Sequence, residues 1–335
     1  MTDNESLIQT AATVSGKLRK FLIDVRVQRV KQGLNPDKSP DGDPAHLSHY
    51  TTADGLQGII QNGNLRASAA YHLNDSSEID YGCQLFGDLL AKEIAAEGRD
   101  LLSKKVFEDA KKAFEPGGFM ESVVYRTYVA CFCEDENLLS QWRTYGQTGG
   151  YSLNFPRHAL ETGLTVHDDL YHVELKKVIY KKETQVQLLQ LVLSDLLSAL
   201  GESSISKLYG SGGIQEKAVF ITSFNTMLQT LAASDIFRFK HPAFQAEREW
   251  RLIVRPLSLN LSHLEVQQLK FRTTAKGLVV PYLELRPKEG ALLPVASVRY
   301  GPTLEKKRVV SSLGLLFRQK GYSIDIHGSD IPAVF

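Results

Sequence analysis

The sequence is poor in cysteine, with three among 335 residues, and it has no apolar run near the roughly 20 residues needed to cross a bilayer. Three cysteines are too few for a disulfide scaffold and fit a reducing compartment. The first ten residues, MTDNESLIQT, lack the basic stretch and apolar core of a secretory signal. From these absences we expect a cytoplasmic protein with no membrane partner.

A strong net charge is also lacking, because the formal net charge at pH 7 is +1. The whole molecule is therefore not a polyelectrolyte binder, and any basic surface must be local. Hydrophobic residues make up 43% of the chain and charged residues 23%, as in a soluble protein with a sizeable core. The length allows one large domain or two.

Cys131 and Cys133 alternate along a predicted strand and therefore share one of its faces. No histidine pair lies near them at the usual spacing of metal ligands, so we expect no metal site there. A thiol in the middle of a strand is typical of a protein core, which argues against a cysteine nucleophile.

The N-terminal part, residues 1–46, is predicted to be a helix over 5–32 followed by a linker over 33–45. Leu18, Phe21, Leu22 and Val25 could form the apolar stripe of this helix. Its many lysines and arginines suit contact with nucleic acid or anionic lipid, but we favour the interpretation that they form the solvated face of a packed helix. The linker holds three prolines, and the main fold is expected from about Leu47.

The rest of the chain mixes strands and helices without strict βαβ alternation, which predicts the α+β class. Extended segments are expected at 47–51, 65–68, 71–73, 123–133, 151–155, 173–180, 252–254, 278–285, 295–300 and 322–326. Helices are expected at 54–62, 79–97, 100–114, 138–145, 184–200, 214–233 and 304–320. The region of about 184–235, with its Ser/Gly-rich patch at 203–213, is interpreted as a helical insertion.

Residues 49–68, HYTTADGLQGIIQNGNLRAS, place His49 where a strand ends and Asp54 where a helix N-cap is expected. The apolar face of the helix holds Leu56, Ile59 and Ile60, and Asn62-Gly63 is expected to end it. A polar strand end beside a helix N-terminus suits phosphates or sugar hydroxyls. An ordinary strand–helix–strand connection would have the same pattern.

Residues 140–146, SQWRTYG, bring two aromatic side chains and a cation together. Trp142 and Tyr145 are three residues apart and share a helix face, which could stack a planar base or a nicotinamide ring. Arg143 could reach a phosphate or carboxylate. The alternative is a core tryptophan and tyrosine beside a surface arginine.

Residues 247–251, EREWR, hold two carboxylates. In an extended chain Glu247 and Glu249 would point to one side and Trp250 to the other. Such a pair suits acid–base work or the stabilisation of an oxocarbenium ion. The alternative is an exposed, charged strand end with cross-strand salt bridges.

Together these three segments resemble the signature elements of the ADP-ribosyltransferase superfamily. A closer resemblance, over roughly 47–335, is to an uncharacterised bacterial family catalogued as a domain of unknown function. Its members carry H-Y-T, N-D-S-S-E, C-F-S-E, L-L-S-Q-W-R-x-Y-G and E-x-E-W-R in this order. The chain departs from many transferases, because Cys131-Phe132-Cys133 stands where they have S-T-S, and because the last two elements are far apart.

The resemblance implies an ADP-ribosyltransferase-like split β-sheet core over 47–335, with helical additions and the helical insertion, and NAD as the substrate. It implies that His49 binds a ribose hydroxyl and that Tyr145 stacks on nicotinamide, with Trp142 as a rival for that place. Glu249 would be the catalytic carboxylate, and Glu247 would orient the acceptor. The other residues expected at the cofactor are Tyr50, Thr51 and Arg143.

The function implied is transfer of ADP-ribose to a macromolecular acceptor, protein or nucleic acid, or hydrolysis of NAD, in a defence or toxin-like role. The alternatives are a non-catalytic module that binds a nucleotide or nucleic acid, and a nuclease or phosphotransferase acting on RNA. If the transferase hypothesis holds, His49, Tyr145 and Glu249 line one cleft. Glu249→Gln should then abolish chemistry at a stability cost within roughly 0.5 kcal/mol.

Overall fold

The computed structural model describes residues 3–32, 42–72, 77–115, 123–145, 149–167, 170–257, 263–274 and 277–332. Most of the predicted linker, and Asn74, Asp75 and Ser76 of the N-D-S-S-E motif, lie outside these residues. The chain forms two compact units. The first takes its described residues from within 1–38, 76–123 and 179–242, and the second from within 39–75, 124–178 and 243–335.

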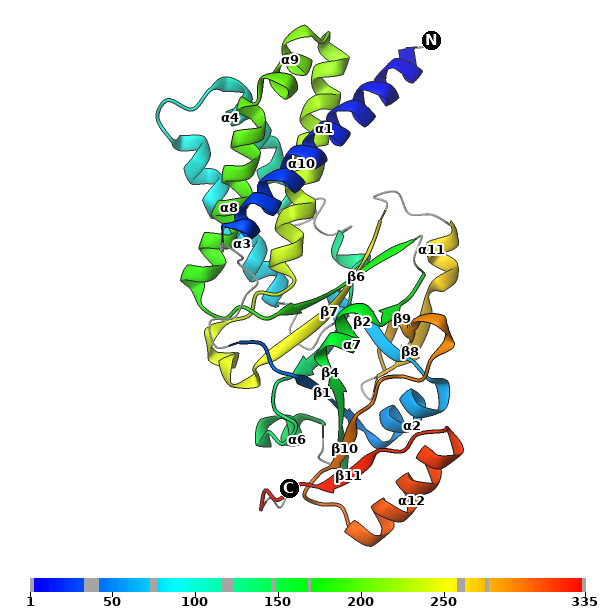
Figure 1. Cartoon of the computed structure of the whole chain (residues 1–335). Helices are drawn as coiled ribbons and strands as arrows, with labels where there is room; N and C mark the ends of the chain where they lie inside the picture. Colours follow the sequence, from blue (N-terminus) through cyan, green and yellow to red (C-terminus); the bar gives the residue numbers. More distant parts are fainter. Residues whose placement is uncertain are drawn as a thin grey trace. The chain divides into compact units, whose positions relative to one another are not determined.

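The first unit is helical (Figure 1). Its helices are α1 (Asp3–Lys31), α3 (Ser77–Ala95), α4 (Leu101–Ala113), α8 (Lys182–Gly201), α9 (Ser203–Ser211) and α10 (Ile214–Ile236). The sequence separated the N-terminal helix from the insertion at about 184–235. The structure instead groups both with α3 and α4 in one unit.

Helix α1 packs by the stripe that its periodicity predicts. Val14, Leu18 and Leu22 are buried at intervals of four residues, whereas Phe21 and Val25 are only half-buried. Burying a leucine side chain contributes about 1.5–3 kcal/mol, so this stripe accounts for much of the attachment of α1. Near its end, Nη1 of Arg29 donates to Oδ2 of Asp195 on α8 at 2.7 Å.

The Ser/Gly-rich patch predicted at 203–213 is mostly the helix α9. The Glu202 carboxylate accepts from the backbone N–H of Ser204 at 3.3 Å and so caps the N-terminus of α9. The Ser/Gly-rich composition of this segment did not predict a helix. Among the described helices none is by itself long and apolar enough to cross a membrane. One bent pair, Lys182–Gly201 with Ser203–Gly210, meets that test of length and composition.

The second unit is built on a mostly antiparallel sheet, so the predicted α+β class is confirmed. Its strands are β1 (His46–Thr52), β2 (Leu65–Ala69), β3 (Tyr128–Cys133), β4 (Gly150–Pro156), β5 (Leu164–Thr165), β6 (Tyr171–Lys177), β7 (Glu249–Pro256), β8 (Lys270–Thr273), β9 (Val279–Pro287), β10 (Ser297–Tyr300) and β11 (Asp325–Gly328). Neighbouring strands follow the order β11-β10-β4-β1-β3-β2-β9-β5, while β7 joins β3 to β6 and β8 lies against β9.

The sheet divides at β3. Strand β7 pairs with β3 along its whole length, from Tyr128 to Cys133. The other edge of β3 is shared, because β1 pairs at Cys133 and β2 pairs at Tyr128 and Val129. Strands β1 and β2 therefore diverge from a common neighbour.

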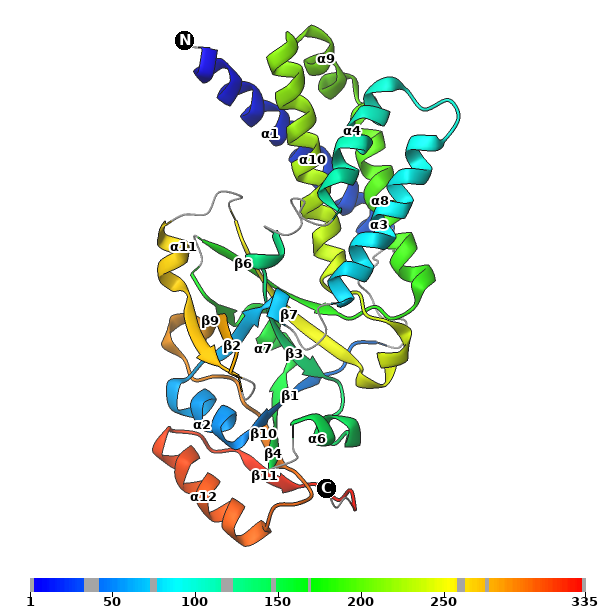
Figure 2. The ribbon, with the colours of Figure 1, turned by 180° about the vertical axis from the view of Figure 1, so that it is seen from behind.

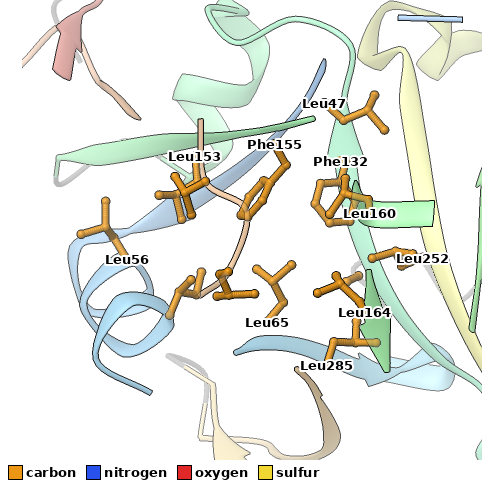
Figure 3. Packing of buried hydrophobic residues seen from close by; sticks show 14 of the residues in the cluster. Leu47, Leu56, Leu65, Phe132, Leu153, Phe155, Leu160, Leu164, Leu252 and Leu285 are labelled. Carbon is orange, nitrogen blue, oxygen red and sulfur yellow. The ribbon is translucent and has the colours of Figure 1, made fainter. Parts of the chain in front are cut away.

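One face of this sheet carries the hydrophobic core. Side chains alternate along each strand, so Leu47, Phe132, Leu153 and Leu252 point to the same side. Figure 3 shows these residues, with further labelled leucines and Phe155, gathered in one interior. Every second residue of the same strands faces away from this core, and the polar side chains discussed below lie there.

Helix α2 (Ala53–Asn62) follows β1 as predicted, with Leu56, Ile59 and Ile60 buried. The predicted N-cap, Asp54, is wrong. The Thr52 hydroxyl accepts from the backbone N–H of Gly55 at 3.2 Å, and Asp54 lies in the first turn. Gly63 ends the helix in the left-handed conformation, with φ 62°, as the sequence indicated.

The remaining elements of this unit are short or peripheral: η1 (Ala70–His72), α6 (Leu139–Tyr145), α7 (Arg157–Thr162), η2 (Pro242–Glu247), α11 (His263–Gln268), η3 (Lys288–Gly290) and α12 (Lys306–Gln319). Residues 71–73 were predicted to be extended, but Tyr71 and His72 belong to the 3-10 helix η1. Strand β3 begins at Tyr128 rather than at residue 123, because the chain is helical at 123–125.

Candidate functional site

A row of polar side chains crosses five strands on the face away from the core. The strand register aligns Ser297 of β10, Asn154 of β4, Ser48 of β1, Cys133 of β3 and Glu249 of β7. Because paired residues of adjacent strands project to the same side, these five side chains share one face. We call them the polar row.

The polar row is largely buried, and the polar groups beside it are incompletely bonded. Ser48, Cys133 and Glu249 are buried, and so is Ser152, which lies next to the row on β4. Among the described residues, Ser152 Oγ and Asn154 Oδ1 have no hydrogen-bond partner. Since an unbonded buried polar atom costs about 1–3 kcal/mol, such atoms beside one another mark a place suited to a polar ligand or water.

Glu249 stands at the β7 end of the row, and Arg251 fixes the orientation of its carboxylate. Nε of Arg251 donates to Oε1 at 2.8 Å and its Nη2 to Oε2 at 3.1 Å. Both side chains are at most 8% exposed. The two residues are neighbours on one face of β7, so the strand itself holds the carboxylate in a single orientation.

Glu247 does not share this geometry, and the predicted extended E-x-E pair is wrong. Glu247 is the last residue of the 3-10 helix η2, and β7 begins only at Glu249. Between them Arg248 has φ 44°, in the left-handed region that residues other than glycine rarely adopt. The alternation that would align two carboxylates therefore starts after Glu247.

His49 lies on the opposite face of β1 from Ser48, and therefore on the opposite face from Glu249. Its ring contacts Phe132 in the core at 5.6 Å between centroids, and Nδ1 lies 2.9 Å from the Cys131 carbonyl oxygen. That contact makes Nδ1 the donor. Burial lowers the pKa of His49 despite this bond, which keeps the imidazole neutral. The expectation that His49, Tyr145 and Glu249 line one cleft is wrong for His49.

Tyr50, rather than His49, is the residue of the H-Y-T motif on the face of the polar row. Its hydroxyl donates to the Asp135 carbonyl and accepts from the Leu138 N–H, both at 2.8 Å. Burial raises the pKa of Tyr50 far above its ordinary value, so the phenol stays protonated. Thr51 projects toward the core side with His49 and is half-buried.

Helix α6 lies against β1 (Figure 2) and carries the aromatic pair of the second segment. Trp142 is fully buried, packs edge-on against Tyr50 at 4.9 Å, and donates from Nε1 to Asn137 Oδ1 at 2.9 Å. Its ring therefore belongs to the core and is closed to stacking on nicotinamide. Tyr145 is half-buried at the margin of this cluster, and Arg143 is exposed.

The loop Glu134–Asn137 ties the surrounding strands together, since each of its side chains binds a different element. Its contacts are Glu134 with Trp250 Nε1 and Lys177 Nζ, Asp135 with Arg248, Glu136 with Arg299 and Asn154, and Asn137 with Trp142, Ser329 and Asp330.

The thiol of Cys133 is held in the same region. It donates to the Glu247 carbonyl at 3.0 Å, and burial raises its pKa to about 12. A thiolate nucleophile at this position is therefore disfavoured. Among the described residues no cluster of three or more His, Cys, Asp or Glu side chains is placed to hold a metal ion.

Several residues of the site were missed by sequence reasoning: Ser48, Asn154, Ser152, Ser297 and Arg251. The alternation of polar and apolar residues in YSLNF was a usable signal, since it marks one face of β4 as polar, whereas LSHY has two polar residues in succession. The alignment of these faces across five strands could not be read locally.

No curated protein and no solved structure matches the chain. Residues 141–252 match the family described as Protein of unknown function (DUF2971). This segment holds most of α6, all of β4 and β6, helices α8 to α10 and the start of β7 with Glu249 and Arg251. Over residues 141–252 the chain is thus similar to that family of unknown function, whereas the expected resemblance extended over roughly 47–335.

Proposed function

We propose that the protein is an NAD-utilising, ADP-ribosyltransferase-like protein, with the polar row as its nucleotide site and Glu249 as its carboxylate. Because His49 lies on the opposite face from Glu249, the proposal departs from the resemblance and assigns no role at the nucleotide to that histidine. The observation that carries the proposal is the register of the row, which ends in a buried, oriented carboxylate. All three sequence segments contribute to this face or its margin, through Tyr50, Tyr145 and Glu249.

The row suits the ribose and amide groups of a dinucleotide. Ser152 Oγ and Asn154 Oδ1 are unbonded among the described residues and could pair with sugar hydroxyls or the carboxamide. Glu249 would accept from a ribose hydroxyl and stabilise the positive charge that develops as nicotinamide leaves. Tyr145, at the margin, remains the candidate for stacking, and Trp142 does not.

The proposed fold is the split sheet of the resemblance. The division at β3, where β1 and β2 leave one edge, supports it. The acceptor of ADP-ribose is proposed as a protein or nucleic acid, with water as acceptor for NAD hydrolysis. A defence or toxin-like role rests on the resemblance alone.

A second candidate is binding of a nucleotide without chemistry. Two observations favour it: Arg251 already neutralises the Glu249 carboxylate, and His49 lies on the other face. Both candidates require NAD or a related nucleotide to bind at the row, and they differ only in whether nicotinamide is released.

The test measures NAD binding by thermal shift and calorimetry, and nicotinamide release by chromatography, on three proteins. Besides the wild type, these are Ser152→Ala, which removes an unbonded hydroxyl beside the row, and Glu265→Gln as a control outside the row. Glu265 forms a comparable buried pair, with Arg126 Nη2 at 2.9 and 2.7 Å, outside the row.

We expect Ser152→Ala to weaken NAD binding about fivefold or more, as for one lost hydrogen bond, without loss of stability. Glu265→Gln should lower stability and leave NAD affinity unchanged. Binding with nicotinamide release supports the transferase, and binding without release supports the second candidate. If the wild type does not bind NAD at millimolar concentration, the nucleotide site itself is refuted.

A further inference from the structure

Arg66 and Arg272, which have no acidic partner among the described residues, lie on one face of the sheet formed by β2, β9 and β8. The guanidinium of Arg66 lies over the Tyr282 ring, 5.1 Å from its centroid. Arg272 reaches across β9, and its Nη2 donates to Ser68 Oγ at 3.1 Å. In the register, Ser68 pairs with Tyr282 and Tyr282 with Lys270, so both arginines flank one tyrosine.

The carboxylate of Glu284, on the same face, is paired with other cations. Glu284 is paired in register with Arg66, yet it binds Lys270 Nζ at 2.8 Å and Arg286 Nη2 at 2.5 Å instead. Burial would raise the pKa of Glu284, but hydrogen bonds from these two cations outweigh it and the pKa is lowered. Among the described residues neither Arg66 nor Arg272 has a carboxylate within 4 Å.

The pKa of Arg272 responds to its burial and to the neighbouring charge of Arg66. Its burial, followed by the charge of Arg66, lowers the pKa of its guanidinium. The charges of the exposed Arg66 and the half-buried Arg272 repel one another, and an anion bound beside them would relieve this repulsion.

We propose that Arg66, Arg272 and Ser68 form a binding site for a phosphate group. Guanidinium groups bind phosphate oxygens bidentately, and a serine hydroxyl supplies a further donor. Tyr282 holds the Arg66 guanidinium by a cation–π contact, which limits the entropy lost when an anion binds. The site does not depend on chemistry at Glu249, because none of its residues belongs to the polar row.

The experiment titrates the full chain with inorganic diphosphate by isothermal calorimetry at low ionic strength, with inorganic sulfate in parallel to separate phosphate from general anion binding. The variants are Arg66→Gln, on an exposed side chain, and Arg272→Gln. Arg272→Lys keeps the charge but loses the planar fork. Arg286→Gln is the matched control, since Arg286 is exposed and paired with Glu284.

We expect the wild type to bind diphosphate more tightly than sulfate, and each glutamine variant to lose at least about tenfold in affinity. Arg272→Lys should recover part of the loss, and Arg286→Gln should bind as the wild type does. The proposal is overturned if the wild type shows no binding, if Arg66→Gln, correctly folded by circular dichroism, binds unchanged, or if sulfate binds equally well. None of these results bears on NAD binding at the polar row.

Discussion

The ion pair between Glu249 and Arg251 changes the stability effect expected from replacing Glu249. A carboxylate in a wet cleft tolerates replacement by an amide, which was the expectation from sequence. The structure places Glu249 at 6% exposure, with both carboxylate oxygens bound by Arg251. Removing the negative charge therefore deprives a buried guanidinium of the carboxylate that binds its Nε and Nη2.

Glu249→Gln should accordingly destabilise the protein by about 1–3 kcal/mol, and Glu249→Ala by about 3–5 kcal/mol. Urea unfolding followed by circular dichroism measures both. The exposed Glu108→Gln is the control and should stay within roughly 0.5 kcal/mol of the wild type. Equal stability of Glu249→Gln and the wild type would show that the pair contributes nothing. If Glu249→Gln is destabilised as expected, its activity must be expressed per folded molecule.

His49 should make stability depend on pH. Burial lowers its pKa in the folded state below the ordinary value of about 6.5 that it has when unfolded. As pH falls below 6.5 the unfolded chain takes up a proton that the folded chain does not, so stability decreases, by up to about 1.4 kcal/mol per pH unit.

In His49→Gln the amide can still donate to the Cys131 carbonyl but does not titrate. The stability advantage of the wild type over this variant should therefore shrink between pH 7.5 and pH 5.5. Urea unfolding at the two pH values gives the difference, and the exposed His158→Gln serves as control. Parallel pH dependence of the wild type and His49→Gln would refute the assignment.

At the scale of elements, the junction between β1 and α2 is held by a cap rather than by Asp54. The Thr52 hydroxyl accepts from the Gly55 N–H, and Thr52 is also the last residue of β1. The same turn thus satisfies a free donor of the helix and fixes the direction in which α2 packs onto the core.

Thr52→Ala should cost about 1 kcal/mol of stability, the usual effect of losing a helix cap. Thr52→Ser keeps the oxygen and should behave as the wild type within a few tenths of that value. Asp54→Asn should also change little, because Asp54 is exposed in the first turn. Thermal melting of the three variants side by side decides the cap. A larger loss in Asp54→Asn than in Thr52→Ala would restore the original expectation.

At the scale of the whole molecule, the basic helix α1 is part of the core of the helical unit. Deleting it would expose the partners of Leu18 and Leu22 and would confound any binding assay. Its exposed cations, Arg19, Lys20 and Arg26, can be changed without touching that stripe.

If α1 recruits nucleic acid, the triple variant Arg19→Glu, Lys20→Glu and Arg26→Glu should abolish salt-sensitive RNA or DNA binding and keep the wild-type melting temperature. Filter binding of a labelled RNA between 50 and 200 mM salt, roughly the range over which phosphate contacts weaken strongly, provides the measurement. Unchanged binding by the variant, or no binding by the wild type at low salt, would reduce α1 to a structural element.

Local sequence patterns determined much about this protein: the α+β class, the helix bearing Leu56, Ile59 and Ile60, the stop at Gly63, and the buried stripe of Leu18 and Leu22. Each of these depends on residues within about one or two turns, so short-range periodicity is sufficient. A resemblance to a family of unknown function was expected over roughly 47–335, and such a family matches residues 141–252.

Only the tertiary structure decided which side chains meet. Whether Ser48 or His49 faces Glu249 depends on the register across β1, β3 and β7, and a shift of one residue would exchange them. Glu247 lies outside the row because the left-handed backbone of Arg248 interrupts the extended chain. Trp142 belongs to the core because it packs against Tyr50 and donates to Asn137. Strand register and packing are set by contacts between residues far apart in the chain, which no local pattern encodes.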